Sequence, residues 1–273
     1  MNDVAPEYVD ARRALLDVLE LLEAQRAGLV LVGAQAIYLH APAEQAHLYT
    51  YTLDGDLALD PDLLTESPDI GRVLVDAGYT EGQNPGTYYS PTGIEIDLMV
   101  PDGALPPPPR RTAILRGQSP ATARRTVGIE LALIDAALME IVALDPTDDR
   151  RIDLRVANPA ALAVAKLIKI EERTFSSRRD RVISKDAGDY LRLLRYCDAE
   201  AIGRRLRELS AIDIAAPLIE RAARFLASDL QSRPSQIVAL ATIELDGVEP
   251  AGQVEIAVRT LSSRLLESFG GPT

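Results

Sequence analysis

Asp54 and Asp56, separated by one glycine, lie in the stretch TLDGDLALD, whose leucines otherwise alternate as in a β-strand. Side chains alternate between the two faces of a strand, so both carboxylates point the same way. Two like charges side by side destabilise a strand unless a positive charge lies between them. Asp97, in the stretch GIEIDLMVP, joins this face if its strand pairs beside the first. The three aspartates would then form an oxygen-rich cluster of the kind that Mg²⁺ or Mn²⁺ prefers.

A cluster of this kind predicts a particular reaction. Two divalent ions held by three carboxylates can activate an attacking hydroxyl and bind the triphosphate of a nucleotide. The nucleotide is then transferred to the hydroxyl of a second substrate, and pyrophosphate leaves. A structural interpretation stands beside this one, because Asp54-Gly55 is also a hairpin-turn signal. Asp97 could likewise be an ordinary solvent-facing strand residue, as Glu95 could be.

Two groups outside the aspartates are candidates for binding phosphate. Gly33 ends the apolar stretch GLVLVG and precedes the helical stretch AQAIYLHA, so a helix N-terminus there would offer free N–H groups. Lys166 lies among alanines, leucines and isoleucines, and shares a helical face with Lys169 and Arg173. Its ammonium needs an anion, such as a triphosphate, or water reached along the helix edge.

Charged residues gather at two further places. Asp186 and Asp189 form an Asp-x-x-Asp pattern at a predicted helix start, which is also the pattern of an N-terminal cap. The segment 110–125 has no acidic residue and contains Arg110, Arg111, Arg116, Arg124 and Arg125. These arginines predict either an arm that grips the phosphates of a triphosphate or an RNA, or a solvated loop.

The elements that must position these residues are predicted from apolar periodicity. Residues 87–101 predict a hairpin that turns at Ser90–Gly93. The other expected elements before Pro159 are helices over 8–26, 34–41 and 68–79 and strands over 28–33, 139–146 and 150–159. From Pro159 the pattern is mostly helical. We therefore expect an α/β (α+β) domain with a mixed β-sheet over residues 1–158, a helical C-terminal domain over 159–273, and the site between them.

Composition narrows the classes of function. The net charge is −12, and residues 1–100 carry most of it, with 17 Asp/Glu against 4 Lys/Arg. This acidic half argues against general nucleic-acid binding and suits metal ions or a cationic substrate. The single cysteine, Cys197, excludes an intrachain disulfide, and the two histidines cannot fill a structural zinc site. With no signal peptide and no long apolar run, we expect a cytoplasmic protein that does not enter the membrane.

Four stretches in order carry a resemblance to a known family: GAQAIYLHA, TLDGDLALD, GIEIDLMVP and KLIKIEER…RVISKDAGDYLRLL. Over roughly residues 28–195 the chain resembles the DNA polymerase β-type nucleotidyltransferase superfamily. Within it, the chain looks most like the AbiEii-type toxin branch of type IV toxin–antitoxin systems. The resemblance implies a catalytic nucleotidyltransferase domain that uses Mg²⁺ and a nucleoside triphosphate.

The resemblance also implies roles for the matching positions. Asp54 and Asp56 would be metal ligands, and Asp97 would be a third ligand or the base. Gly33 would let the chain approach the nucleotide phosphates. Gln35 stands where the family usually has a small polar residue such as serine, and would supply that contact instead.

Matches also lie in the helical part and imply further site residues. Lys166 corresponds to the lysine of the branch's helical motif, and Lys185, Asp186 and Asp189 correspond to its final motif. With Arg110 and Arg111, Lys185 would help to hold the triphosphate.

The implied activity is transfer of a nucleoside monophosphate to a hydroxyl acceptor. In the toxin branch the acceptor can be tRNA, and a cognate antitoxin would be a partner. Two alternatives stay open. The first is transfer to a cationic small molecule of the aminoglycoside type, which the acidic half would attract. The second is a catalytically silent nucleotide-binding or regulatory module of the same fold, which the altered residues after Gly33 favour.

Overall fold

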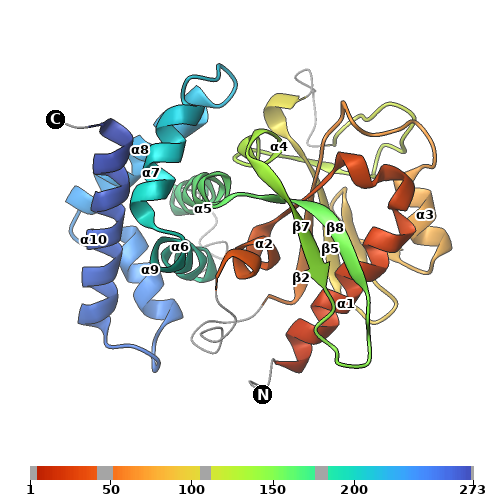
Figure 1. Cartoon of the computed structure of the whole chain (residues 1–273), viewed down its shortest axis with the longest axis horizontal. Coiled ribbons are helices and arrows are strands. Elements are labelled where there is room, and N and C mark those ends of the chain that lie inside the picture. Colours follow the sequence, from red (N-terminus) through yellow and green to blue (C-terminus); the bar gives the residue numbers. More distant parts are fainter. Residues whose placement is uncertain (1–4, 42–51, 105–111, 176–183, 272–273) are drawn as a thin grey trace. The chain divides into compact units, whose positions relative to one another are not determined.

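The computed structural model describes residues 5–41, 52–104, 112–175 and 184–271. The chain divides into two compact units, Met1–Ala36 with Tyr51–Asn158 and Ile37–Thr50 with Pro159–Thr273. The first unit contains the β-sheet, and the described part of the second is helical (Figure 1). One division therefore falls between Asn158 and Pro159, where the two domains were expected to meet. Two further divisions assign residues 37–50 to the helical unit.

One mixed sheet forms the first unit, as the sequence predicted. Among the described residues it has eight strands, and seven of them follow the order β3-β4-β5-β2-β1-β8-β7, with β6 also paired to β5. Pairs β1–β8, β2–β5 and β5–β6 are parallel, and the others are antiparallel. The strands are β1 (Leu29–Val32), β2 (Asp54–Leu59), β3 (Thr80–Glu81), β4 (Thr87–Tyr89), β5 (Glu95–Pro101), β6 (Arg124–Thr126), β7 (Ala136–Val142) and β8 (Arg151–Ala157).

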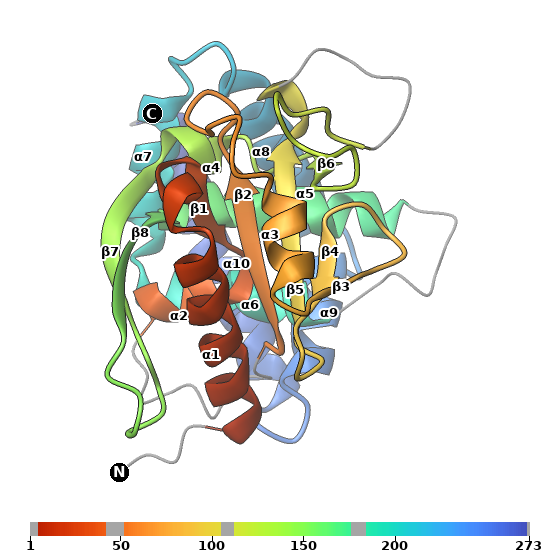
Figure 2. The ribbon, with the colours of Figure 1, turned by 90° about the vertical axis from the view of Figure 1, so that its right-hand side faces the viewer.

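Helix α1 (Pro6–Leu21) covers one face of this sheet together with α3 (Ile70–Asp76) (Figure 2). The apolar stripe predicted for α1 is buried, including Leu15 and Leu19. Gly55 of β2 lies against α1, because a Cβ there would be 3.8 Å from Leu15 Cδ1. Since neighbouring residues of a strand face opposite ways, Asp54 and Asp56 point to the other face of the sheet.

The predicted hairpin is confirmed. β4 and β5 are antiparallel, and Gly93 donates its N–H to Ser90 O at 2.8 Å in the turn between them. Gly93 has a φ of 84°, a left-handed conformation that glycine adopts without strain. β3 was not predicted, because a two-residue strand has no readable alternation.

The second unit is a set of packed helices, which confirms the helical prediction. They are α5 (Pro159–Thr174), α6 (Lys185–Tyr196), α7 (Ala199–Leu209), α8 (Ala216–Gln231), α9 (Gln236–Glu244) and α10 (Ala251–Gly270). Helix α2 (Gly33–His40) begins in the first unit and passes into the second at Ile37. No helix in the described ranges has the length and apolar character that crossing a bilayer requires.

Candidate active site

Strand register brings four carboxylates together in the first unit. β2 and β5 run parallel, with Asp54 beside Glu95 and Asp56 beside Asp97. The expectation that the strand of Asp97 pairs beside that of Asp54 and Asp56 is therefore confirmed. Residues paired across neighbouring strands share a face, so Glu95 joins the three aspartates. We call Asp54, Asp56, Glu95 and Asp97 the carboxylate row.

The carboxylates of the row repel one another electrostatically. Asp97 is 8% exposed, so its carboxylate is largely removed from water. Burial raises the pKa of Glu95, and the charges of Asp97 and Asp54 raise it further, while a hydrogen bond from Tyr89 opposes them. A row with this electrostatic repulsion needs a nearby cation.

Arg124 provides a cation from the chain itself. Its Nη1 and Nη2 donate to the two carboxylate oxygens of Asp97, so the pair is bidentate. Thr87 Oγ1 donates to Asp97 Oδ1 at 2.7 Å and accepts from Arg124 Nη1 at 3.2 Å. Burial acts to lower the pKa of Arg124, but Asp97 and, more weakly, Asp56 and Glu95 raise it overall. Arg124 was expected in a phosphate-gripping arm, and its contact with Asp97 was not foreseen.

Gly33 lies directly against the row. A Cβ on Gly33 would be only 2.0 Å from Asp56 Oδ2, and its φ of 68° is left-handed. No other residue fits this position without displacing Asp56. Glycine thus allows the start of α2 to approach the carboxylates, whereas the approach to nucleotide phosphates that the sequence suggested stays a prediction.

Gln35 is a buried anchor between α1, α2 and β2. Its Nε2 donates to Asp54 O at 3.0 Å and to Ala11 O at 3.2 Å, and its Oε1 accepts from Arg12 Nε at 2.9 Å. These contacts hold the backbone of Asp54. The side chain predicted to contact phosphate is therefore committed to positioning the strand in this structure.

The predicted site residues of the helical part form a separate group in the second unit. Lys166 Nζ lies 3.0 Å from Asp186 Oδ1 and 2.7 Å from Asp189 Oδ2. Lys169 lies 3.5 Å from Asp186, and Arg173 pairs with its other oxygen. We call these five residues the ionic cluster of the second unit. Its aspartates supply the anion that Lys166 was expected to need.

The pKa values in this cluster follow the ion pairs. Burial acts to lower the pKa of Lys166, but the charges of Asp189 and Asp186 raise it well above its usual value. Burial acts to raise the pKa of Asp186, and Lys166, Lys169 and Arg173 together lower it strongly. Lys166 and Asp186 are therefore both ionised at neutral pH.

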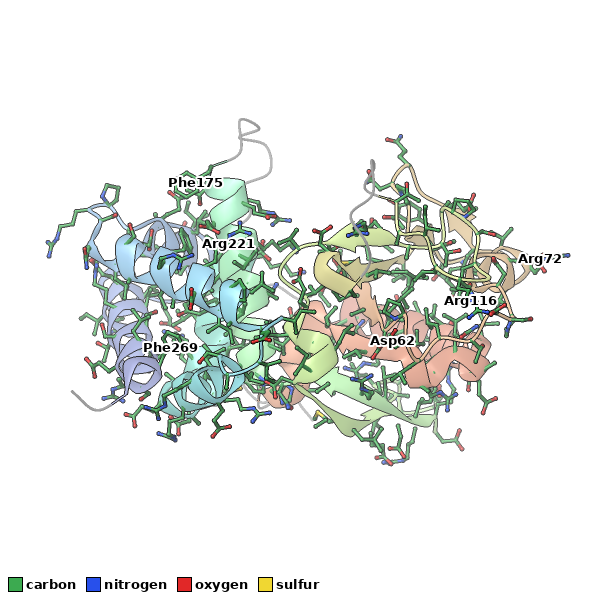
Figure 3. All side chains as sticks on the ribbon, turned by 90° about the horizontal axis from the view of Figure 1, so that it is seen from above. Asp62, Arg72, Arg116, Phe175, Arg221 and Phe269 are labelled. Carbon is green, nitrogen blue, oxygen red and sulfur yellow. The ribbon has the colours of Figure 1, made fainter. Side chains whose placement is uncertain are left out.

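The other described residues that were predicted to bind phosphate are not gathered at the carboxylate row. Arg110 and Arg111 lie outside the described residues. Arg116, at the surface of the first unit (Figure 3), lies 2.6 Å from Glu66. Arg125 Nε donates to Asp102 Oδ1 at 2.9 Å. Lys185 is the first residue of α6.

The donor set of the row suits a hard divalent cation, because carboxylate oxygens on one face are its preferred ligands. Within the described residues, no group of three or more His, Cys, Asp or Glu side chains is arranged as a ready metal site. Asp97 is instead paired with Arg124. Asp54 and Asp56 supply two carboxylates on this face, and Asp97 could join them as a ligand only if the guanidinium of Arg124 moved aside.

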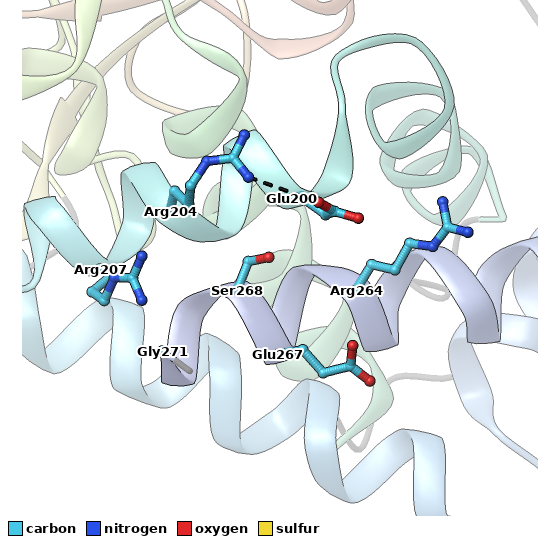
Figure 4. Close-up of a pocket in the computed structure, with 7 residues that line it drawn as sticks. All are labelled: Glu200, Arg204, Arg207, Arg264, Glu267, Ser268 and Gly271. Atoms are coloured by element: carbon cyan, nitrogen blue, oxygen red, sulfur yellow. Dashed lines mark ion pairs between the residues drawn. The ribbon is translucent and has the colours of Figure 1, made fainter. Parts of the chain in front are cut away.

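A concavity of about 500 Å³ lies between α7 and α10 of the second unit (Figure 4). Gly203 lets these helices approach closely, since a Cβ there would be 2.3 Å from Leu265 O. The lining residues are Glu200, Arg204, Arg207, Arg264, Glu267, Ser268 and Gly271. This lining carries both charges and contains none of the predicted site residues, so the carboxylate row remains the better candidate.

Sequence reasoning missed Arg124 as a partner of the row, together with Glu95 and Thr87. The signal for Glu95 was present, because it lies two residues before Asp97 on the same strand. The contact of Arg124 depends on β6 pairing beside β5, with Arg124 opposite Met99. A three-residue strand after an irregular segment leaves no periodic signal from which that pairing could be read.

Comparisons of the chain with protein-family models, with curated proteins and with solved structures find no match. The similarity to polymerase β-type nucleotidyltransferases therefore rests on the sequence motifs.

Proposed function

We propose that the chain is a metal-dependent nucleotidyltransferase whose catalytic groups lie in the first unit. The observation that supports this most strongly is the register of β2 and β5, which places Asp56 beside Asp97 on one face. Gly33 opens a helix directly against Asp56. A helix start beside clustered carboxylates is what transfer from a nucleoside triphosphate requires.

Each of these groups has a role in the proposed reaction. Asp54 and Asp56 would hold Mg²⁺ or Mn²⁺, which when bound neutralises charge on the triphosphate and activates the attacking hydroxyl. The start of α2 at Gly33, which lies against Asp56, would approach the triphosphate from the same side as this carboxylate. Thr52 Oγ1 donates to the Asp54 carboxylate, and Gln35 donates to the backbone carbonyl of Asp54. Asp54 is therefore oriented before metal or nucleotide binds. Asp97 would accept the proton of the acceptor hydroxyl or complete the metal site.

The identity of the acceptor depends on charged groups outside the carboxylate row. A tRNA acceptor would need basic groups, for which Arg110, Arg111 and Arg116 are the candidates. A cationic small molecule would instead be drawn by the acidic first hundred residues. We favour the tRNA acceptor, with a cognate antitoxin as partner, because the motifs resemble the toxin branch.

One observation favours the silent module as the second candidate. The bidentate contact of Arg124 with Asp97 already neutralises part of the row. A protein that kept the fold without catalysis could use such a pair as a permanent substitute for the metal.

The test is incubation with each α-phosphate-labelled nucleoside triphosphate, Mg²⁺ or Mn²⁺, and either total tRNA or an aminoglycoside. The double variant Asp54→Asn/Asp56→Asn should lose label transfer and metal-dependent nucleotide binding, because amides do not replace two anionic ligands. Asp62→Asn removes an exposed carboxylate of the same unit (Figure 3) and should transfer label like the wild type.

Label on tRNA supports the toxin-type reaction, and label on the aminoglycoside supports the small-molecule reaction. Nucleotide binding without transfer to either acceptor would favour the silent module. Calorimetric titrations with metal and nucleotide that are unchanged in the double variant would contradict the metal assignment.

A further inference from the structure

We infer that Arg124 couples the binding of metal and triphosphate at the carboxylate row, so that each ligand binds weakly without the other. This inference rests on the proposed function and adds a role that the family motifs do not assign. In the absence of ligands Arg124 holds Asp97. A metal ion that recruits Asp97 must displace the guanidinium, and a triphosphate offers that guanidinium a new anionic partner.

The first support is the strength of the contact that a metal would have to break. Both guanidinium nitrogens engage both oxygens of Asp97, and the side chains are 26% and 11% exposed. Bidentate, charge-assisted hydrogen bonds shielded from water are among the strongest polar contacts in proteins. Removing one partner leaves the other as a buried, unpaired charge. Binding of the metal ion alone is therefore weakened by the free energy needed to separate Arg124 from Asp97.

The second support is the set of charges around Arg124. Thr87 on β4 contacts both members of the pair. Asp56 on β2 and Glu95 on β5 act electrostatically on Arg124 in addition to Asp97. Arg124 is thus the direct counter-ion of Asp97 and acts at longer range on Asp56 and Glu95. A divalent ion and Arg124 would each neutralise the same carboxylates, so they compete.

The third support is that the main chain of Arg124 is fixed. β6 is paired to β5 with Arg124 beside Met99, and a Cβ added to Gly86 would lie 2.7 Å from Arg124 N. Only the side chain can swing, so a displaced guanidinium stays near the row. Its planar fork matches phosphate oxygens as well as it matches a carboxylate. Triphosphate binding would therefore release Asp97 to the metal, and by linkage metal would favour triphosphate.

The test measures Mn²⁺ affinity of the full chain by calorimetry, with and without a non-hydrolysable nucleoside triphosphate analogue. In the wild type, saturating analogue should tighten Mn²⁺ binding by about tenfold or more, within the usual range of coupling between sites. Arg124→Gln should bind Mn²⁺ alone about tenfold more tightly than the wild type, and the analogue should add little further. The control is Arg72→Gln, which removes an exposed arginine of the same unit that pairs with Asp76 and should behave as the wild type.

Two additional variants separate the loss of positive charge at position 124 from the loss of the contact with Asp97. Arg124→Lys keeps a positive charge without the fork, so its Mn²⁺ affinity should fall between wild type and Arg124→Gln. Asp97→Asn should abolish the difference between arginine and glutamine at position 124, because the competition is for this carboxylate.

Equal Mn²⁺ affinity in wild type and Arg124→Gln would overturn the inference. If Arg124→Gln binds Mn²⁺ more tightly but the analogue itself binds to no variant, with or without Mn²⁺, the coupling is wrong and so is the proposed nucleotide substrate. If the analogue binds normally and the two ligands show no coupling in the wild type, only the inference fails and the proposed function stands.

Discussion

Lys166 lies on α5 with its ammonium between Asp186 and Asp189 of α6, and only 7% of its side chain is exposed. A lysine in such a place contributes to stability only as part of an ion pair. Its removal leaves two buried aspartates with fewer counter-charges. The fold of the second unit therefore depends on Lys166 whether or not Lys166 also contacts a nucleotide.

Lys166→Met should lower the free energy of unfolding by about 3–5 kcal/mol, the usual cost of breaking a buried ion pair by removing one partner. Denaturant unfolding monitored by circular dichroism measures this loss. Lys169→Met is the control, because the Lys169 side chain is 49% exposed and should change stability by no more than about 0.5 kcal/mol. If Lys166→Met unfolds like the wild type but loses nucleotide transfer, Lys166 is catalytic and its structural role is negligible.

At the scale of elements, the sequence predicted the elements with clear periodicity and missed the short strands that have none. The alternation of Ile96 and Leu98 located β5, and Pro159 marked the first residue of α5. The hairpin register followed from its short turn. β6 has only three residues and follows an irregular segment, and no residue pattern in Arg124–Thr126 specifies that it pairs with β5. The aspartates of the candidate site were therefore predictable, whereas their counter-ion was not.

Gly33→Ala tests the junction of β1 and α2. The added methyl meets Asp56 Oδ2, and alanine is strained at a φ of 68°, so we expect a loss of about 1–3 kcal/mol in the free energy of unfolding. Displacement of Asp56 should also weaken Mn²⁺ binding. Gly252→Ala on α10 is the matched control, because a Cβ there meets nothing within 4 Å. Unchanged stability and Mn²⁺ affinity in Gly33→Ala would show that the close approach of Gly33 to Asp56 is not needed.

At the scale of the whole molecule, several carboxylates are held in their ionised form. Hydrogen bonds from Thr147 and Arg13 lower the pKa of Asp145 to about 2, and Arg195 lowers the pKa of Glu249. The most buried example is Asp186. A carboxylate whose pKa is lower in the folded state stabilises the protein above its unfolded pKa, which is about 3.9 for aspartate. That stability is lost as the pH falls below this value toward the folded pKa.

Thermal unfolding between pH 7 and pH 3 should therefore show stability that is steady above about pH 5 and falls below about pH 4. Asp186→Asn should be less stable than the wild type at pH 7, and the difference should shrink as the pH falls below about 4. Asp213→Asn, at an exposed carboxylate, should follow the wild-type profile. A difference between Asp186→Asn and wild type that is constant across this range would contradict the assignment.

The assignment of residues 37–50 to the helical unit affects how the chain folds during its synthesis. Tyr38 stacks against Arg192, whose Cζ is 4.3 Å from the ring centroid, and Cys197 Sγ lies 3.7 Å from His40 O, 157 residues along the chain. At a synthesis rate of about 5–20 residues per second, the ribosome needs on the order of ten to thirty seconds to supply these partners. During that interval the end of α2 is exposed without them. We therefore expect the end of α2 to reach its native contacts only after Arg192 and Cys197 have been synthesised.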